Sequence, residues 1–164
     1  MKKAIIVDLD GTLSNCDHRR HFVARPRIIP PTGTPKFKPD WDAFYAGLSA
    51  DKLNEWCYKI LKIFYSATAS DYDELYSILL VTGRPAEHMQ ATLDWLQQHH
   101  VPFNKLFMRP SGNTEKDCIV KQRIYQEEIN GFYEVLFVIE DRQQVVDMWR
   151  SLGLTCLQCA KGDF

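Results

Sequence analysis

The chain has 164 residues, of which 45% are hydrophobic and 25% are charged, and its formal net charge is −1. This length suits one domain with a real hydrophobic core, and the composition makes intrinsic disorder a poor interpretation. The near-neutral charge excludes a protein that is basic over its whole surface, although a local basic patch remains compatible with it.

No apolar run approaches the roughly 18 residues that are needed to cross a bilayer. The apolar N-terminal stretch meets Asp8 and Asp10 before it is long enough for a signal peptide, so we expect a strand there. The five cysteines are odd in number and scattered, which is typical of reduced thiols. We therefore expect no membrane partner and a cytoplasmic location, or the host cytoplasm if the source is a virus.

Short apolar strands alternate with helical stretches, a pattern that predicts an α/β fold with a mostly parallel sheet. The predicted strands cover residues 3–7, 75–81, 105–108, 135–139 and 154–159. The last of them contains Cys156 and Cys159. Residues three apart on a strand point to opposite faces, so we expect these two thiols to fill space rather than to bind a metal or each other.

Three helices are predicted between these strands. Pro85 suits the first position of a helix whose apolar face includes Met89. Thr114 and Asp117 look like the N-terminal capping pair of a second helix, before the fourth strand. The third helix covers residues 145–152.

A long insertion separates the first two strands, with more than sixty residues where a strand–helix connection needs only a few. Its end, residues 53–64, has the apolar spacing of a helix. Residues 18–38 contain four prolines, which prevent a continuous helix, and no acidic residue. The basic residues of this stretch are Arg19, Arg20, Arg25, Arg27, Lys36 and Lys38. We expect an irregular, positively charged insertion over the mouth of the domain.

Two carboxylates, Asp8 and Asp10, come directly after the first strand in the sequence DLDGTL. Ligands of an open parallel sheet bind beyond the carboxyl ends of its strands, and Gly11 allows a tight departure that directs both acids to such a site. One carboxylate can attack phosphorus while the other exchanges a proton with the leaving oxygen. A turn with two solvated acids is the alternative, and this motif alone does not decide between them.

Groups suited to a phosphate occur in two further places. Thr82, Gly83 and Arg84 follow the second strand and offer a hydroxyl, flexible backbone and a guanidinium. Lys121 lies four residues after Asp117 on one helix face and offers an ammonium group. The alternatives are an ordinary strand-to-helix turn and an exposed Asp–Lys pair.

A second pair of acids, Glu140 and Asp141, follows the fourth strand. Parallel strands end at one edge of the sheet, so this pair is expected near Asp8 and Asp10. Clustered carboxylates repel one another and need a hard cation such as Mg²⁺. Asp141 as the N-cap of the next helix is the alternative.

These motifs, in this order and in these strand and helix contexts, resemble the haloacid dehalogenase superfamily over the whole chain. The resemblance implies a Rossmann-like core with a mostly parallel five-stranded sheet flanked by helices. That core would comprise residues 1–14 and 75–164. Residues 15–74 would form a cap, a basic proline-rich loop followed by a helix, inserted after the first strand.

The same resemblance implies roles for the site residues. Asp8 would be the nucleophile, and Asp10 the general acid and base. Thr82 and Lys121 would bind phosphate. Mg²⁺ would be held by Asp8, the backbone carbonyl of Asp10, and Asp141.

The C-terminal third is similar to the 3′-phosphatase domain of phage polynucleotide kinase–phosphatases. The shared stretches are residues 116–121 (KDCIVK), 139–150 (IEDRQQVVDMWR) and 162–164 (GDF). This resemblance implies an enzyme that removes 3′-phosphates from DNA or RNA ends through an aspartyl-phosphate. The chain contains no Gly-x-x-x-x-Gly-Lys-Ser/Thr loop, so we expect no ATP-driven activity from it. Whether a separate kinase or ligase acts beside it stays open.

In that group, Arg19, Arg84 and Asp117 would also contact the substrate, and the pair Glu140–Asp141 would serve the metal. Glu140 is a departure, since the group has a second aspartate at this position.

The basic insertion is the part of the sequence that indicates the type of substrate. Each phosphate that a basic side chain neutralises releases counterions, so a cluster of basic residues favours the binding of a polyanion. It and the residues after it also carry aromatic rings that unpaired bases can stack on, namely Phe22, Phe37, Trp41, Phe44 and Tyr45. The alternative is a solvated cap whose aromatic residues form their own small core. With the family resemblance, a nucleic-acid end is favoured over free nucleotides or small phosphorylated metabolites, and over a binding module without catalysis.

Overall fold

A computed structural model describes residues 1–24, 37–67 and 76–162 of the chain. Its centre is a parallel five-stranded sheet of order β5-β4-β1-β6-β7. The strands are β1 (Lys2–Val7), β4 (Tyr76–Pro85), β5 (Lys105–Arg109), β6 (Tyr133–Arg142) and β7 (Cys156–Gly162). All five predicted strands and the α/β fold class are confirmed.

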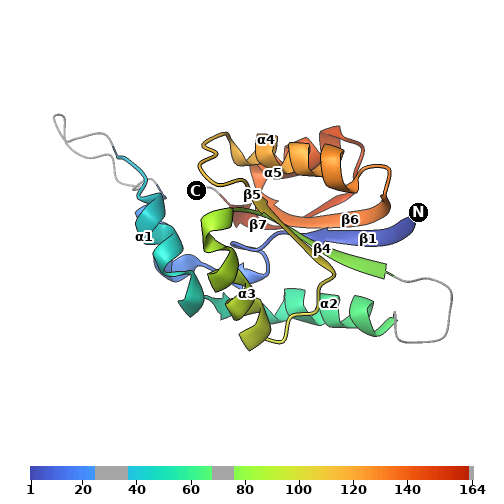
Figure 1. Ribbon diagram of the computed structural model, residues 1–164, viewed down its shortest axis with the longest axis horizontal. Helices are drawn as coiled ribbons and strands as arrows, with labels where there is room; N and C mark the ends of the chain where they lie inside the picture. Colours follow the sequence, from blue (N-terminus) through green and yellow to red (C-terminus); the bar gives the residue numbers. More distant parts are fainter. Residues whose placement is uncertain (25–36, 68–75, 163–164) are drawn as a thin grey trace.

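Helices cover both faces of this sheet (Figure 1). On one face lie α2 (Glu55–Ala67) and α3 (Met89–Gln98), and on the other α4 (Asp117–Ile124), with its π-helical extension Tyr125–Ile129, and α5 (Gln143–Ser151). The alternation of side chains along β1 serves both layers: Ile5 and Val7 pack towards α2 and α3, and Ala4 and Ile6 towards α4 and α5. The central strand is therefore buried on both faces, as its continuous apolar sequence requires.

The starts of two helices differ from the prediction. Pro85 ends β4, and a 3₁₀ turn (Ala86–His88) precedes α3, so the proline lies just before the helical segment rather than inside it. Met89 is 36% exposed, because the buried face of α3 is formed further along by Trp95 and its neighbours. Thr114 caps no helix, since α4 begins at Asp117 and has no side-chain cap.

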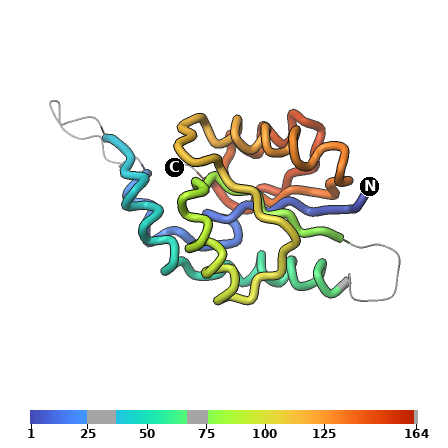
Figure 2. Tube along the Cα trace, viewed as in Figure 1, coloured from blue at the N-terminus to red at the C-terminus, as the bar shows by residue number. Residues whose placement is uncertain are grey.

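The insertion begins with a short antiparallel pair, β2 (Ser14–Asn15) and β3 (Lys52–Leu53). Among the described residues between these strands are two 3₁₀ segments, Asp17–Phe22 and Leu48–Ala50, and helix α1 (Trp41–Ala46). Figures 1 and 2 show α1 beyond the end of the main sheet, away from both helical layers. Arg25, Arg27, Lys36 and the four prolines of residues 18–38 lie outside the described residues.

Helix α2 also belongs to the insertion, but it packs against the main sheet through Cys57 and Leu61. Two residues of the predicted helix do not fit its apolar face: Leu53 lies in β3, and Trp56 is 43% exposed. The division of the chain into a core and a cap of residues 15–74 stays a prediction.

The cysteines behave as their positions on β7 suggest. Cys156 packs on the sheet face covered by α5, whereas Cys159 packs on the face covered by α2, so the two thiols point to opposite sides. All five cysteines are free. In the parts of the chain that the structure describes, no helix combines the length and apolar character needed to span a membrane.

Candidate active site

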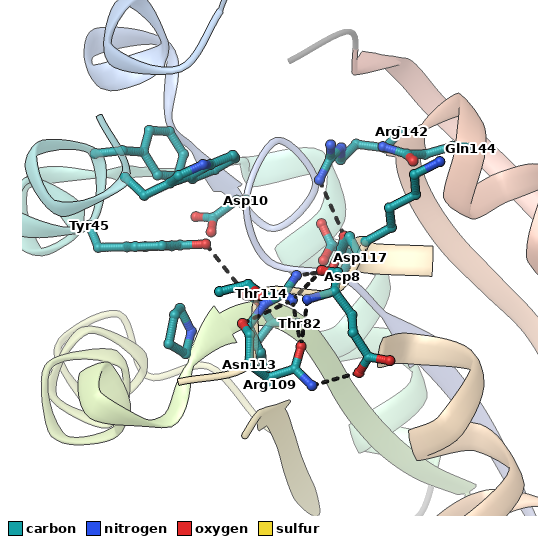
Figure 3. Close-up of a pocket in the computed structure, with 16 residues that line it drawn as sticks. Asp8, Asp10, Tyr45, Thr82, Arg109, Asn113, Thr114, Asp117, Arg142 and Gln144 are labelled. Carbon is teal, nitrogen blue, oxygen red and sulfur yellow. Dashed lines mark hydrogen bonds and ion pairs between the residues drawn. The ribbon is translucent and has the colours of Figure 1, made fainter. Parts of the chain in front are cut away.

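The acids and the Thr82–Arg84 motif meet at the carboxyl ends of three neighbouring strands. Val7, the last residue of β1, is in register with Leu80 of β4 and Ile139 of β6. The residues that follow these positions therefore converge at one edge of the sheet. A pocket of about 410 Å³ opens there, with Asp8 and Asp10 in its lining (Figure 3).

Asp8 lies in a group of buried charges. The Lys121 ammonium group donates hydrogen bonds of 2.7 Å to Asp8 Oδ1 and of 2.7 Å to Glu140 Oε2. It also lies 3.5 Å from Asp117 Oδ2, so the predicted Asp117–Lys121 pair exists but is buried rather than exposed. One lysine thus serves three carboxylates.

The pKa values in this group reflect its excess of negative charge. Burial and the neighbouring Glu140 carboxylate raise the pKa of Asp8 to about 8, although Lys121 opposes them. Burial is also the main reason why the pKa of Glu140 and that of Asp141 rise to about 7. Burial alone would lower the pKa of Lys121, but Asp117, Asp8 and Glu140 outweigh it and raise that pKa well above its usual value.

Asp8, Glu140 and Asp141 can each offer one carboxylate oxygen to a common cation, since these oxygens lie within 4.8 Å of one another. Asp141 Oδ1 is buried and accepts no hydrogen bond from any described residue. A Cβ atom on Gly11 would lie 2.3 Å from the other oxygen of Asp141, so a glycine lets the Asp8–Asp10 loop pass this close. A dense set of oxygen ligands with one unsatisfied atom fits a hard divalent cation.

Glu140 is the most constrained member of this acidic cluster. Its Oε2 accepts from Lys121, while its Oε1 accepts from the backbone N–H groups of Asp141 (3.2 Å) and Arg142 (3.3 Å). Asp141 is the second-to-last residue of β6 and does not cap α5, whose N-cap position is Arg142. The Asp10 carboxylate is not part of the acidic cluster, and metal binding by its backbone carbonyl stays a prediction.

Asp10 has a different environment, made of arginines. The Arg84 side chain donates to both carboxylate oxygens of Asp10, through Nε at 3.0 and 3.1 Å and through Nη2 at 2.6 Å. Arg19 Nη2 and Ser14 Oγ also donate to Asp10 Oδ1. Burial alone would raise the pKa of Asp10, but the guanidinium groups of Arg84 and Arg19 hold it well below its usual range.

Both arginines are themselves buried, and neither lines the pocket. The structure therefore brings Arg19 and Arg84 to the candidate site through their contacts with Asp10. Their predicted role as direct ligands of the substrate stays a prediction.

Asp51 is a site residue that sequence reasoning missed. It is 3% exposed and accepts from Arg19 Nε (2.7 Å) and from Arg84 Nη2 (3.1 Å). His18 Nε2 lies 3.0 Å from the same carboxylate. The Asp51 carbonyl accepts from Trp95 Nε1 (2.9 Å), which fixes the residue to α3. No motif or spacing marks this position in the sequence.

The strand-end motif of β4 is arranged for close approach of its backbone to the site. Thr82 is buried, lines the pocket and accepts from the backbone N–H of Arg84 (3.2 Å). A Cβ atom on Gly83 would lie 2.2 Å from Asp117 Oδ1, so only glycine fits beside that carboxylate. The Gly83 carbonyl accepts from Arg109 Nε (2.8 Å).

Asp117, the first residue of α4, contacts the arginines that end β5 and β6. Besides the contact to Lys121, its carboxylate accepts from Arg109 Nη2 (3.3 Å) and from Arg142 Nη1 (3.4 Å), as Figure 3 shows. Arg109 and Arg142 both line the pocket, and neither was singled out from the sequence. Their signal was weak, because each is a lone basic residue at a strand end.

A parallel α/β sheet with a DxD pair after its first strand, and with a lysine and an acidic pair at the same edge, defines a phosphatase of the haloacid dehalogenase class. The family described as "Polynucleotide kinase PNKP phosphatase domain" matches residues 44–164. The chain belongs to this family of phosphatase domains.

Individual relatives agree with this membership. A candidate bifunctional polynucleotide kinase/RNA ligase of Autographa californica nuclear polyhedrosis virus is 38% identical over 93% of the chain, which spans only 18% of that protein. Two solved structures of a Pnkp1/Rnl/Hen1 complex, one titled an RNA repair complex, match all of the chain at 32% identity, with TM-scores of 0.75 and 0.77. The chain spans 44% and 47% of those matched chains.

A candidate phosphatase from Clostridium difficile shares the fold, with a TM-score of 0.60 and 17% identity over 96% of this chain and 84% of its own.

Proposed function

We propose that this chain removes 3′-phosphate groups from nucleic-acid ends through a covalent phosphate intermediate on Asp8. The observation that carries the proposal is the position of Asp8: its carboxylate lines the pocket, bonds to the Lys121 ammonium group and adjoins two further acids. A carboxylate held in this way can attack phosphorus in line while the lysine offsets the charge on the transferring group. Family membership supports the same reaction class.

Asp10 is the group proposed to move the proton. In the free protein it is ionised by its arginine neighbours, which suits the second step, where a water must lose a proton to attack the phosphate on Asp8. In the first step, the negative charge of the bound phosphate raises the pKa of Asp10 by repulsion, so that this carboxyl can protonate the departing 3′ oxygen.

Asp8 and Asp141, with Glu140 beside them, are the residues proposed to hold Mg²⁺. When bound, this ion offsets negative charge on both the carboxylate cluster and the phosphate. Lys121 keeps Asp8 and Glu140 oriented, and Thr82 offers a hydroxyl to the phosphate from the end of β4. Groups that offset the charge of the phosphate are needed, since uncatalysed hydrolysis of phosphate monoesters requires acceleration of up to ~10²¹-fold.

The relatives bear on the nature of the nucleic acid. The matched complexes include one titled an RNA repair complex, and the viral relative combines a polynucleotide kinase with an RNA ligase in its name. We therefore extend the proposal to RNA ends as the preferred substrate, acted on beside a kinase and a ligase that complete the repair of the break.

A screen for phosphate release tests the proposed function. The substrates are 3′- and 5′-phosphorylated RNA and DNA oligonucleotides and 3′-mononucleotides, each with and without Mg²⁺ and at low and moderate salt. We expect the fastest release from 3′-phosphorylated RNA, only with Mg²⁺, and weaker use of this substrate as salt rises. Equal turnover of oligonucleotides and mononucleotides without salt dependence would assign the chain to small phosphorylated molecules. Binding without release would make it a non-catalytic module.

A further inference from the structure

The pocket extends from the two aspartates to a wall of aromatic side chains on α1. Trp41, Phe44 and Tyr45 line it on this side. Figure 3 shows the Tyr45 hydroxyl pointing towards the middle of the site, where it donates to the Gly83 carbonyl (3.4 Å). The aromatic wall and the reacting groups thus share one compartment.

The rings of this wall hold one another in place. Trp41 and Tyr45, one helical turn apart, are stacked with centroids 6.0 Å apart and ring planes at 25°. Phe44 is buried beneath them: the Trp41 ring meets it edge-on at 5.8 Å, and the Arg19 guanidinium lies 4.0 Å from its centroid. The Asp40 carboxylate accepts from the backbone N–H of Ala43 and caps the start of the helix. The Trp41 ring is therefore oriented before any ligand binds.

Trp41 is not needed for the small core of the insertion. That core consists of Cys16, Val23 and Phe44, with Phe22 and Tyr45 packed against it. Trp41 stays outside this cluster and is 40% exposed. The view that these aromatic residues merely form a core of the cap explains Phe44 but leaves Trp41 unexplained.

Apart from the aromatic wall, much of the pocket lining is polar and can receive the sugar and phosphate of a chain end. Asn113, Thr114, Lys116 and Gln144 contribute amide, hydroxyl and ammonium groups. Two acids, Glu115 and Asp117, also line the pocket, but the described structure pairs each of them with an arginine. The volume of about 410 Å³ falls in the range of pockets that hold one small-molecule ligand, which here corresponds to about one nucleotide.

We infer that the base of the nucleotide bearing the 3′-phosphate stacks on the Trp41 ring while its phosphate meets Asp8. This inference rests on the proposed function and specifies its substrate as an unpaired end. Every base has a π-face, so stacking tolerates all four bases, and a base held in a duplex must first leave its pair. The site then selects an unpaired end without reading its sequence.

The test compares two 3′-phosphorylated oligonucleotides that differ only in whether C1′ of the terminal ribose carries a base or a hydrogen atom. The proteins are wild type, Trp41→Ala, Trp41→Phe and the matched control Trp56→Ala. Trp56 is 43% exposed on α2 and does not line the pocket. For wild type and Trp56→Ala we expect kcat/KM to fall about 5- to 150-fold when the base is removed. This range corresponds to the binding free energy that one stacked base contributes.

Trp41→Ala should show the low value on both oligonucleotides, and Trp41→Phe should retain part of the preference. Unchanged activity of Trp41→Ala on the abasic end would show that the variant is folded. The inference is overturned if wild type uses both ends equally, or if Trp41→Ala keeps the preference for the base. Absence of phosphate release by wild type from either end would instead refute the proposed function.

Discussion

The two aspartates of the β1 loop are two residues apart, yet they lie in opposite electrostatic environments. Around Asp8 are two further carboxylates, Glu140 and Asp141, and the pKa of Asp8 is raised to about 8 through burial and the Glu140 charge. Around Asp10 are two guanidinium groups that overcome the effect of burial and lower its pKa. One loop thus separates a site where carboxylates outnumber the single Lys121 ammonium group from a site that is rich in positive charge.

This difference indicates how the two acids divide the reaction. Pairs of titratable groups whose surroundings push their pKa values apart mark distinct acid–base roles. In the proposed mechanism, the acidic cluster around Asp8 takes a cation, and Asp8 is the partner of metal and phosphorus. The arginine environment would keep Asp10 ionised and available as a base. Substituting one of these residues at a time tests this division of roles.

Asp8→Asn should have the largest effect. It removes the proposed nucleophile, so we expect kcat to fall at least ~10⁴-fold, as loss of a covalent nucleophile does in other hydrolases. Steady-state phosphate release measures this change. Asp147→Asn, at an exposed carboxylate on α5, is the matched control and should remain close to wild type. Wild-type protein incubated with beryllium fluoride and Mg²⁺ should hold a phospho-aspartate mimic, and its appearance on any residue other than Asp8 would refute the assignment.

Asp10→Asn should be the next most damaging, because general acid–base catalysis contributes about 10²–10⁴-fold. The loss should be smaller for an ester with a good leaving group, such as p-nitrophenyl phosphate, since that leaving oxygen needs little protonation. The ratio of kcat values for the two substrates is the measurement. If the variant lost the same factor on both, Asp10 would not act on the leaving group.

Asp51→Asn should lower kcat by a smaller factor, about 10- to 100-fold, comparable to losing a residue that orients a metal ligand. Asp51 contacts both Arg19 and Arg84, and we expect it to act through them on Asp10. The double variant with Asp10→Asn provides the discriminating measurement. If Asp51 acts through Asp10, the double variant should be no slower than Asp10→Asn alone, whereas additive losses would make Asp51 a general stabiliser of the fold.

Asp51 also marks the limit of what could be predicted from the sequence. The sheet and the motifs at its strand ends were predictable, because buried parallel strands are apolar runs and the chain places these motifs directly after them. The lone strand-end residues Arg109 and Arg142 carried too weak a signal. Asp51 reaches Arg19 and Arg84 only through the path of the part of the insertion before α2, which has no periodic pattern to follow. At Trp56 the pattern was present, but apolar spacing alone wrongly assigned this residue to the buried face of the helix.

The role of Arg84 shows a second limit, one of chemistry rather than of path. A guanidinium after a strand suggests a phosphate ligand, and sequence carries no information about an internal carboxylate that competes for it. In the structure Arg84 contacts both oxygens of Asp10. The motif in the sequence identified Arg84 as a site residue, but its contact with Asp10 became visible only in the structure.

Binding of Mg²⁺ should give the smallest effect, a change in thermal stability that depends on pH. The raised pKa values of Asp8 (about 8), Glu140 (about 7) and Asp141 (about 7) mean that the metal-free fold favours their protonated forms. Their contribution to stability is therefore complete below pH ~4, where these acids are also protonated in the unfolded chain, and is lost as pH rises towards 8. A divalent cation compensates the charges that appear over this window.

Mg²⁺ at about 100 times its Kd should add about 2.7 kcal/mol, or roughly 5–10 °C in Tm for a chain of this length, at pH 8. The shift should be smaller at pH 6, because protons then compete for the same carboxylates. Differential scanning fluorimetry with Mg²⁺ and with EDTA at both pH values measures it. Asp141→Asn should remove most of the shift, because it replaces a carboxylate whose Oδ1 accepts no hydrogen bond from any described residue. A larger shift at pH 6 than at pH 8 would contradict a metal site built from these acids, and would leave the excess negative charge around Asp8 without its proposed counterion.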